Sequence, residues 1–339
     1  MHLLYNYPLQ HLNSFRLPAC AKQYICFQSI QDVEDFCVAG RMPKIDFYIL
    51  GGGSNTLFVQ AAPACILHAS LQGIEVIQES MHGIWVQAGA GVAWDKLVSF
   101  CVSRGYAGIE NLSGIPGTVG AAPIQNIGAY GVELKEVLYQ VEAIELCSGT
   151  RRIFSAKECA FEYRNSIFKT HLRNKYFLTS VVLSLQKTPK FRLEYAGILE
   201  KLDAMQVQKP SLQAVRDAVV ALRQQKLPDP VVLGNAGSFF KNPLVSKEKY
   251  TFLKKEYPSL VAFPTEKASV SKLSAAWLIA KAGFKGFRAG KVGISPTHAL
   301  VLVQYGGATG QEVWSFALRI QEKVKTQWQI ELEPEVTIV

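Results

Sequence analysis

The chain has 339 residues, which is long for one hydrophobic core, because single cores rarely grow beyond roughly 250–300 residues. Its residues are 49% hydrophobic and 19% charged, a balance typical of globular proteins that excludes intrinsic disorder. The formal net charge of +9 favours an anionic partner, which leaves nucleic acid, a membrane surface and phosphorylated small molecules open.

The N-terminus and the cysteines predict a cytoplasmic protein without a metal centre. The first residues, MHLLYNYPLQ, lack the regions of a secretory signal, and no apolar run approaches the roughly 20 residues that cross a bilayer. The seven cysteines form no CxxC pair, and their odd number argues against disulfides and zinc. Lysine and arginine are spread along the chain, with 285–291 (KGFRAGK) the densest group. Phosphates of cofactors and substrate explain the charge at least as well, so neither nucleic acid nor a membrane is needed as a partner, although charge alone does not choose between them.

The first half of the chain alternates short strands with helices and glycine-rich turns. A helix is expected over residues 93–103, where Trp94, Leu97, Val98 and Cys101 share one face. Apolar, strand-like runs predict strands at residues 45–50, 84–88, 140–147 and 176–185.

The second half follows a basic, proline-containing hinge at residues 186–190 (QKTPK), where a domain boundary is expected. Residues 212–225 predict an amphipathic helix, stopped by the LPDP that follows it. Residues 311–327 predict another. The inward-facing residues of the two helices are Val215, Val219 and Leu222 in the first, and Val313, Phe316, Ala317, Ile320 and Val324 in the second. Such stripes are typical of core-facing helices rather than of partner surfaces.

Gly51–Asn55 is a glycine-rich turn at the end of a predicted strand. Glycine has no Cβ, so backbone N–H groups there can crowd a phosphate, and Ser54 and Asn55 add side-chain donors. The spacing differs from the GxGxxG of a dinucleotide-binding Rossmann unit. A tight connection between strands explains this turn equally well.

The segment 114–131 (GIPGTVGAAPIQNIGAYG) is long and rich in small residues. Small residues let a flat cofactor lie against the backbone, whose amides can hydrogen-bond the heteroatoms of an isoalloxazine ring. Long ordered loops inside compact domains are mostly functional. A cofactor site is therefore favoured over a plain connection.

Three later clusters hold polar side chains between apolar ones. Residues 161–168 (FEYRNSIF) place Arg164 among aromatics, where its charge requires a partner such as a carboxylate. Residues 234–243 (GNAGSFFKNP) place Ser238 after a small-residue turn, without the GxSxG pattern of a hydrolase. Residues 331–335 (ELEPE) set acidic groups before the apolar C-terminal end. Taken singly, a core ion pair, a turn serine and a solvated acidic end explain the three clusters better than function does.

Six segments are far more specific together than any one of them. They are ILGGGSN, AGIENLSGIPGTVGAAPIQNIGAYGVE, FEYRNSIFK, LPDP with GNAGSFFKNP, KLSAAWLIAKAG and LEPEV. The segments occur in the order and approximate spacing of one family. The chain therefore resembles the UDP-N-acetylenolpyruvoylglucosamine reductase family, the bacterial cell-wall enzymes that make UDP-N-acetylmuramate. The resemblance extends from about residue 5 to the C-terminus.

The resemblance implies an α+β fold with two domains. An FAD-binding domain of the vanillyl-alcohol-oxidase (PCMH) type would span residues 1–187, in subdomains of about 1–70 and 71–187. An α+β substrate-binding domain would span residues 188–339, and its last strand, about 330–339, would return toward the flavin. NADPH would reduce FAD and be replaced by UDP-N-acetylglucosamine enolpyruvate. Hydride would then pass from flavin N5 to C3 of the enolpyruvyl group and a proton to C2, in an enzyme that is expected to be a monomer.

The resemblance also assigns roles to residues. Ser238 would donate the proton to C2, and Arg164 and Glu335 would stabilise the enolic intermediate. The FAD contacts would be Gly51, Gly52, Gly53, Ser54, Asn55, Pro116, Gly117, Gly120, Ala121, Gln125, Asn126 and Gly128. The substrate contacts would be Tyr130, Tyr163, Lys226, Asn242 and Tyr195, the last on a loop that closes over the substrate.

Two departures from the family pattern and two alternatives stay open. Ala280 stands where many relatives have an acidic residue and His298 where some have glutamine, so a substrate contact by His298 is in doubt. One alternative is an FAD oxidase of the same superfamily, which would use oxygen instead of NADPH. The other is a non-enzymatic nucleotide- or nucleic-acid-binding protein that has kept the fold. The joint presence of Arg164, Ser238 and Glu335 favours the reductase.

Overall fold

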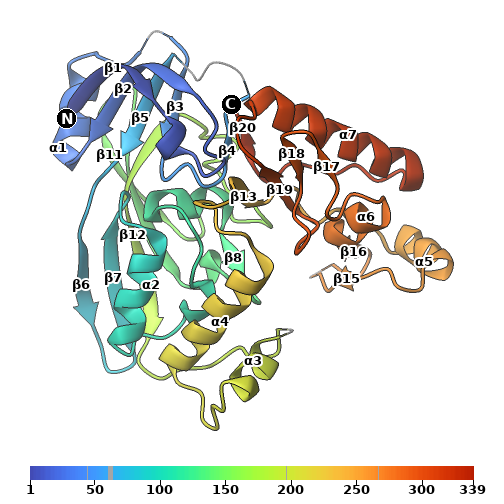
Figure 1. Ribbon diagram of the computed structural model, residues 1–339. Coiled ribbons are helices and arrows are strands. Elements are labelled where there is room, and N and C mark those ends of the chain that lie inside the picture. Colours follow the sequence, from blue (N-terminus) through green and yellow to red (C-terminus); the bar gives the residue numbers. More distant parts are fainter. Residues whose placement is uncertain (44, 60–63, 196, 266) are drawn as a thin grey trace. The chain divides into compact units, whose positions relative to one another are not determined.

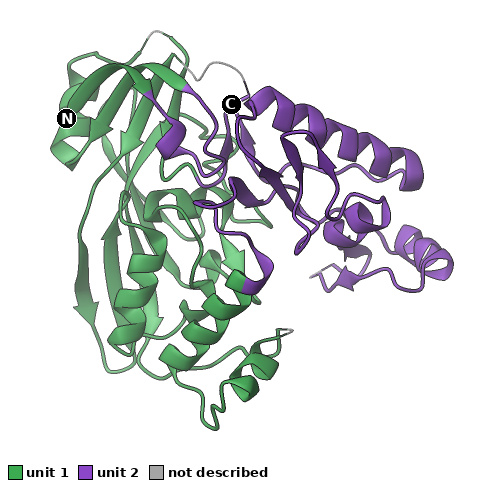
Figure 2. Cartoon of the chain, in the orientation of Figure 1, with its two compact units in different colours: residues 1–7, 20–53, 63–224 green, residues 8–19, 54–62, 225–339 purple. Residues whose placement is uncertain are grey.

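The computed structural model describes residues 1–43, 45–59, 64–195, 197–265 and 267–339, which form two compact units (Figure 2). Unit 1 comprises Met1–Tyr7, Cys20–Gly53 and Pro63–Gln224, and unit 2 comprises Pro8–Ala19, Ser54–Ala62 and Gln225–Val339. Unit 1 thus continues beyond the predicted hinge at residues 186–190. The division of function between residues 1–187 and 188–339 stays a prediction.

Unit 1 contains two larger sheets (Figure 1). The first has the strand order β1-β2-β5-β3, with bounds His2–Pro8, Cys20–Phe27, Cys65–Ala69 and Phe47–Leu50. In it β5 pairs in parallel with both β2 and β3. The second has the order β11-β10-β12-β7-β6, with bounds Arg151–Ser155, Leu138–Glu145, Tyr176–Gln186, Gly83–Gly89 and Ile74–Glu79. Its pairings are antiparallel.

The central strand β12 explains why residues 176–185 are almost uninterruptedly apolar. It lies between β10 and β7, and nearly all of its residues are buried, so both faces need apolar side chains. Phe177 packs into one core together with β2, β5 and α1, whereas Leu178 packs into the core that includes β7 and α2. Strand β12 therefore joins two hydrophobic cores of unit 1.

Helices and short elements complete unit 1. The bounds are α1 (Ile30–Val38), α2 (Trp94–Ser103), α3 (Ile198–Ala204), α4 (Leu212–Lys226), η2 (Glu110–Leu112), η3 (Val119–Gln125), η4 (Leu134–Glu136), β8 (Gly128–Ala129) and β9 (Val132–Glu133). The predicted face of α2 is confirmed, since Trp94, Leu97, Val98 and Cys101 are all buried. Asp95 of α2 forms a bidentate ion pair with Arg216 of α4, at 2.6 and 2.7 Å. This pair helps to explain why α4 groups with unit 1 rather than with the sequence that follows it.

Unit 2 is built on a four-stranded antiparallel sheet with the order β13-β19-β18-β17. These strands span Asn235–Ser238, Val301–Gln304, Val292–Ile294 and Arg288–Ala289. The remaining elements are η1 (Gln10–Leu12), β4 (Thr56–Leu57), β14 (Leu244–Ser246), α5 (Lys247–Glu256), β15 (Ala262–Phe263), β16 (Val270–Leu273), α6 (Ala275–Lys281), α7 (Gly310–Trp328) and β20 (Thr337–Ile338). The last strand, β20, pairs in parallel with β4.

Helix α7 confirms the helix predicted at residues 311–327. Thr309 and Glu312 form a capping box, with the Glu312 amide 3.2 Å from the Thr309 hydroxyl and the Thr309 amide 2.7 Å from the Glu312 carboxylate. The predicted apolar stripe from Val313 to Val324 is buried in the core of unit 2. The first residue of the helix, Gly310, is glycine because a Cβ there would lie 1.7 Å from the Phe58 carbonyl oxygen, so no larger residue fits.

Candidate active site

The two glycine-rich segments of unit 1 lie against each other. A Cβ on Gly51 would lie 2.6 Å from the Thr118 hydroxyl oxygen, and a Cβ on Gly52 would lie 3.1 Å from the Cα of Gly117. The Gly51 contact is with a side chain, which would have to shift for a larger residue, whereas at Gly52 the backbone of Gly117 itself leaves little room for a Cβ. Residues that are more than 60 positions apart in the sequence therefore form one small-residue surface.

This surface carries polar groups that the protein itself does not use. Among the described residues, the Thr118 hydroxyl oxygen is buried and has no hydrogen-bond partner. Within the same part of the chain, the amides of Gly52 and Gly53 donate no hydrogen bond to another backbone carbonyl. A buried unpaired polar atom is costly, which suggests that a ligand completes the set.

Gly120 shows how tightly the second segment is packed. Its amide donates to the Ala90 carbonyl at 2.9 Å, and a Cβ on Gly120 would lie 2.6 Å from the Ala90 Cβ. Of the other predicted cofactor contacts in this segment, Ala121 and Gln125 are half-buried and Pro116 is exposed. Ala121 adjoins Gly51, where a Cβ would lie 3.2 Å from the Ala121 Cβ.

Asn126 has its side chain fully engaged by unit 1. The amide nitrogen donates to the Glu133 carboxylate at 2.9 Å and to the Glu162 carbonyl at 3.2 Å, while the amide oxygen accepts from the Lys135 amide at 3.0 Å. A ligand can therefore reach Asn126 through its main chain without breaking these bonds, but not through its side chain. The cofactor contact predicted for Asn126 stays a prediction.

Arg164 is anchored by the same segment. Its Nη2 donates to the Gly128 carbonyl at 2.7 Å, its Nη1 lies 3.5 Å from the Asn126 carbonyl, and its guanidinium lies 5.4 Å from the Tyr163 ring. Its partners thus include two carbonyl oxygens and an aromatic ring. The carbonyls orient the guanidinium beside the small-residue segment.

Two residues of this segment, and Arg164 which it anchors, adopt left-handed backbone conformations. The φ angles are 47° for Asn126, 49° for Tyr130 and 54° for Arg164. Residues other than glycine rarely adopt this conformation, which costs about 1–3 kcal/mol each. Strain of this kind gathers at functional sites, and three neighbouring examples support a functional role for the segment.

Tyr130 lies beside the loop predicted to close over the substrate. The Tyr130 and Tyr195 rings meet edge to face, with centroids 5.5 Å apart. Burial raises the pKa of Tyr130, and Tyr195 is exposed. Arg192 connects the same loop to the Gly131 carbonyl at 3.2 Å. Unit 1 therefore brings two of the predicted substrate tyrosines together.

Ser238 and Glu335 are linked through the backbone of unit 2. The Glu335 amide donates to the Phe239 carbonyl at 2.8 Å, one residue beyond Ser238. Asn55 is bonded to the same C-terminal segment as Glu335. Its side chain donates to the Glu335 carbonyl at 3.1 Å, and its carbonyl accepts from the Thr337 amide at 2.9 Å. Two of the three predicted catalytic residues and one predicted cofactor contact thus lie together in unit 2, while Arg164 belongs to unit 1.

The predicted substrate contacts of unit 2 lie on segments near the strand that carries Ser238. Asn242 accepts a hydrogen bond from the Ala275 amide at 3.0 Å and so helps to cap α6. Lys226 ends α4, and its carbonyl accepts from the Thr297 hydroxyl at 2.9 Å. His298 follows directly, and burial, together with the charges of Lys226 and Lys285, lowers its pKa.

Comparisons with known proteins agree with this arrangement. Residues 21–155 match the profile of an FAD binding domain, and residues 229–339 match that of the C-terminal domain of UDP-N-acetylenolpyruvoylglucosamine reductase. The reductase of that name from Amoebophilus asiaticus is 45% identical over 339 residues, 100% of both chains. The one from Pseudomonas aeruginosa is 42% identical over 96% of both chains. The chain belongs to the UDP-N-acetylenolpyruvoylglucosamine reductase family.

A solved structure of the same reductase, from Thermus caldophilus, shares the fold. It has a TM-score of 0.66 and 23% identity, and the match covers 99% of this chain and 98% of that one. The predicted α+β fold with an FAD-binding domain is confirmed by this likeness and by the profile match. The residues present also fit the cofactor, because the unpaired Thr118 hydroxyl and the glycine amides offer donors to a diphosphate.

Two residues that shape the site were not predicted from the sequence. Arg223 on α4 donates from Nε to the Gly114 carbonyl at 3.0 Å, and its charge acts on Tyr130. Burial lowers the pKa of Arg223, but from a value so high that the group stays charged. Asn235 holds the turn before Ser238 through three side-chain hydrogen bonds. The only sequence signals were a polar residue on a helix and one in a small-residue turn.

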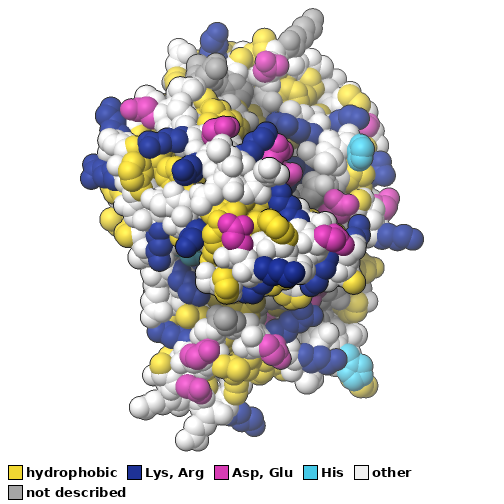
Figure 3. All heavy atoms as spheres, turned by 90° about the vertical axis from the view of Figure 1, so that its right-hand side faces the viewer, with side chains coloured by type: hydrophobic (Ala, Val, Ile, Leu, Met, Phe, Trp, Pro, Cys, Tyr) yellow, Lys and Arg dark blue, Asp and Glu magenta, His cyan; other side chains and the backbone are white. Residues whose placement is uncertain are grey.

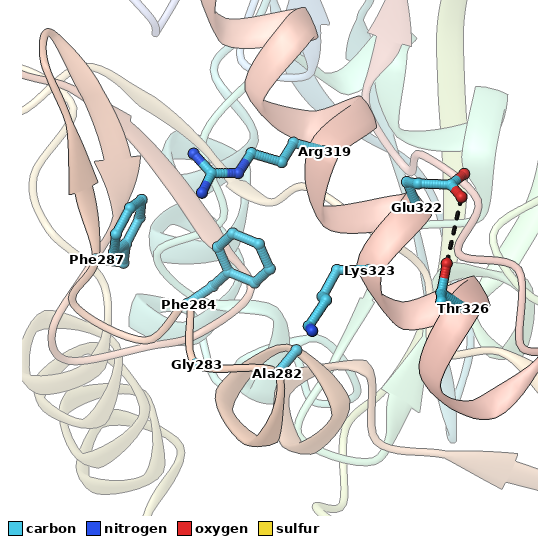
Figure 4. A pocket seen from close by; sticks show the side chains of 8 residues that line it. All are labelled: Ala282, Gly283, Phe284, Phe287, Arg319, Glu322, Lys323 and Thr326. Carbon is cyan, nitrogen blue, oxygen red and sulfur yellow. Dashed lines mark hydrogen bonds between the residues drawn. The ribbon is translucent and has the colours of Figure 1, made fainter.

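The cavity drawn in Figure 4 contains none of the predicted site residues. It measures about 530 Å³ and lies in unit 2, between the end of α6 and α7. Phe284 and Phe287 line it, and Arg319 reaches toward both rings at 5.9 and 5.3 Å. The Arg319 guanidinium thus packs against aromatic rings of the same unit, so Arg319 has a structural role.

Charged side chains of both signs share the face of the molecule shown in Figure 3. On the face shown in Figure 3, lysine and arginine side chains lie among acidic ones and do not form a continuous stripe. Within the described residues, no helix combines the length and apolar character needed to cross a membrane. Among the same residues, no cluster of three histidine, cysteine or acidic side chains is arranged to hold a metal ion.

Proposed function

We propose that this chain catalyses the NADPH-dependent reduction of UDP-N-acetylglucosamine enolpyruvate to UDP-N-acetylmuramate, with FAD as its cofactor. The observation that carries the proposal is the full-length identity to reductases of this name, with Ser238 and Glu335 linked in one unit. NADPH and nucleotide sugars are cytoplasmic metabolites, so we propose that the enzyme works there.

The cofactor would be held by the small-residue surface of unit 1. The Thr118 hydroxyl and the amides of Gly52 and Gly53 are suited to the FAD diphosphate, because each is a donor without a backbone partner. The main chain of residues 117–128 is suited to the flat ring, since small residues and glycine line it. When bound, FAD supplies the hydride carrier between NADPH and C3 of the enolpyruvyl group.

Ser238 is proposed as the proton donor to C2. Addition of hydride at C3 leaves negative charge that delocalises from C2 into the carboxylate as an enolate. An enolate of this kind is basic enough to take the proton of a serine, although serine is a weak acid in water. A positioned acid contributes about 10²–10⁴-fold to such a rate. Backbone pairing of β13 with β19, at Ser238 and Val301, fixes the serine main chain.

Arg164 and Glu335 are proposed to stabilise the enolate. The carbonyls of Gly128 and Asn126 orient the guanidinium of Arg164, which would balance the developing oxyanion. The amide of Glu335 donates to the Phe239 carbonyl, one residue beyond Ser238, and its carboxyl group would form a hydrogen bond with the substrate. Each residue adds stabilisation only as charge appears, which lowers the barrier rather than the substrate's KM.

The remaining substrate contacts are proposed from charge and position. Lys226 and Asn242 of unit 2 would bind the diphosphate and sugar, and Arg223 of unit 1 adds a buried cation near Tyr130. Tyr163 packs on the guanidinium of Arg164. Tyr195 would close over the bound substrate.

The test separates the reductase from an FAD oxidase of the same superfamily. The purified holoenzyme should consume one NADPH per enolpyruvyl substrate under nitrogen and form a product that is 2 Da heavier. Oxygen consumption without this substrate dependence, or purified protein that neither is yellow nor takes up FAD, contradicts the proposal.

A further inference from the structure

Asn111 connects two segments of unit 1 through a single amide group. It lies in η2 and is 1% exposed, and its Nδ2 donates to the Tyr130 carbonyl at 2.9 Å and to the Arg192 carbonyl at 2.8 Å. Among the described residues, no backbone amide donates to either carbonyl. The two N–H groups of a planar amide point in fixed directions, so this one side chain determines where both carbonyls lie.

Tyr130 and Gly131 form the turn of the β8–β9 hairpin. Their φ angles are 49° and 81°, both in the left-handed region that the central residues of a type I′ turn adopt. A tyrosine in this region is strained, so the turn needs contacts that hold it. Arg192 provides one, because its Nη1 donates to the Gly131 carbonyl at 3.2 Å while its Nη2 pairs with Glu136 at 2.6 Å. Groups outside the hairpin therefore bind both carbonyls of the turn.

The residues that follow Arg192 bring Tyr195 onto this turn. The Tyr195 ring meets the Tyr130 ring edge to face, and a Cβ on Gly131 would lie 3.7 Å from the Tyr195 Cδ2. Phe191 and Leu193 pack on the apolar cluster formed by α3 and α4. Apolar packing is non-directional. The hydrogen bonds at Arg192 are therefore what fixes this segment against the turn.

The oxygen of the Asn111 amide shows which part of the side chain matters. In the part of the chain that the structure describes, Oδ1 is buried and accepts no hydrogen bond. A buried acceptor without a partner is destabilising, and an apolar residue at this position would avoid that cost. The two donated hydrogen bonds are thus what the asparagine contributes.

We propose that Asn111 and Arg192 are positioning residues that bind both carbonyls of the Tyr130–Gly131 turn and so set Tyr195 against Tyr130. The effect on the substrate rests on the proposed function, in which Tyr195 covers the bound nucleotide sugar. A tyrosine that is in place for only a fraction of the time weakens binding in proportion to that fraction. Asn111 and Arg192 act on the substrate only through Tyr195.

Limited trypsin digestion of the FAD-loaded enzyme tests the positioning without any substrate. Lys190 is exposed and precedes the segment that Asn111 binds, so cleavage after Lys190 reports how firmly that segment is held. We expect Asn111→Leu, which is similar in shape but cannot donate, to be cleaved there about 3–10-fold faster, the factor for one hydrogen bond. Arg192→Met should show the same increase, and it alters an exposed side chain that folding does not require. Cleavage at the wild-type rate in either variant overturns the proposal.

The KM for the enolpyruvyl substrate tests the effect on function. Asn111→Leu should raise KM about 3–10-fold in the wild-type background but less than about 2-fold in Tyr195→Ala, where the residue through which it acts is missing. Equal factors in the two backgrounds overturn the proposal. An unchanged KM in Tyr195→Ala, together with faster cleavage after Lys190 in Asn111→Leu and Arg192→Met, supports the positioning and contradicts only the proposed substrate role of Tyr195.

Asn13→Leu is the matched control. Asn13 is 4% exposed and lies in unit 2, where its Nδ2 donates to the carbonyls of Leu9 at 2.9 Å and Leu17 at 3.0 Å. Its replacement should lower the free energy of unfolding but leave KM and the cleavage after Lys190 unchanged. Changes in Asn13→Leu as large as those in Asn111→Leu would show that the effects arise from lost stability alone, which overturns the inference.

Discussion

Replacement of Asn235 by alanine is expected to destabilise unit 2 and to misplace Ser238. The Asn235 side chain is 2% exposed and donates to the carbonyls of Pro228 at 3.0 Å and Leu233 at 2.8 Å. It also accepts from the Gly237 amide at 2.9 Å. Each such bond contributes about 1 kcal/mol, so Asn235→Ala should lower the free energy of unfolding by about 3 kcal/mol. Gly237, with φ of 67°, then loses the bond that fixes the turn before Ser238.

Urea unfolding of the FAD-saturated protein measures the first effect, and the rate of flavin reoxidation by the enolpyruvyl substrate measures the second. Gln213→Ala is the matched control, because Gln213 makes an exposed hydrogen bond to Asp217 at 2.7 Å and should change the unfolding free energy by less than about 0.5 kcal/mol. We expect Asn235→Ala to slow reoxidation while NADPH still reduces the flavin. An unfolding free energy within about 0.5 kcal/mol of the wild type would refute the reasoning.

Three further predictions concern unit 1. Thr118→Val should leave the apoprotein at least as stable, since it removes a buried unpaired hydroxyl, but should raise the Kd for FAD about 10-fold or more; an unchanged Kd in a flavin fluorescence titration contradicts the diphosphate contact. The hydrogen bonds from Arg216 lower the pKa of Asp95, so the stability that this carboxylate adds is present above pH 4 and is lost as the pH falls through its folded pKa. Urea unfolding should therefore show Asp95→Asn less stable than the wild type at pH 6, with the gap narrowing as the pH falls below 4, and a pH-independent gap argues against the pair. Tyr195→Ala should raise KM for the enolpyruvyl substrate while flavin reduction by NADPH keeps its rate, and a slower NADPH step contradicts a role confined to the substrate.

Hydrophobic periodicity was enough to predict the main elements of the fold. The helices around Trp94, Val219 and Phe316 and the strands at 84–88 and 176–185 are all present, because the burial of one face dictates their pattern. The end of unit 1 was not predictable in this way. It depends on the contact of α4 with α2 through Asp95 and Arg216, which are 121 residues apart.

The candidate site could be predicted only through its motifs. The glycines at 51 and 52 and the segment that follows Gly114 stand out as small-residue stretches, and the structure brings them together, with the backbone of Gly117 against Gly52. Thr118 and Asn235 do not stand out, because their importance arises from an unpaired hydroxyl in one case and from buried carbonyls in the other. Such properties depend on the folded surroundings and not on residue type or spacing. The roles of the site residues remain proposals.

Anaerobic stopped-flow spectroscopy of Ser238→Ala beside the wild type tests the central claim most directly. NADPH should bleach the flavin at the wild-type rate in both proteins, because the serine takes no part in that step. Subsequent mixing with UDP-N-acetylglucosamine enolpyruvate should restore the colour about 10²–10⁴-fold more slowly in the variant. Reoxidation of Ser238→Ala at the wild-type rate would contradict the assignment of Ser238 as the proton donor.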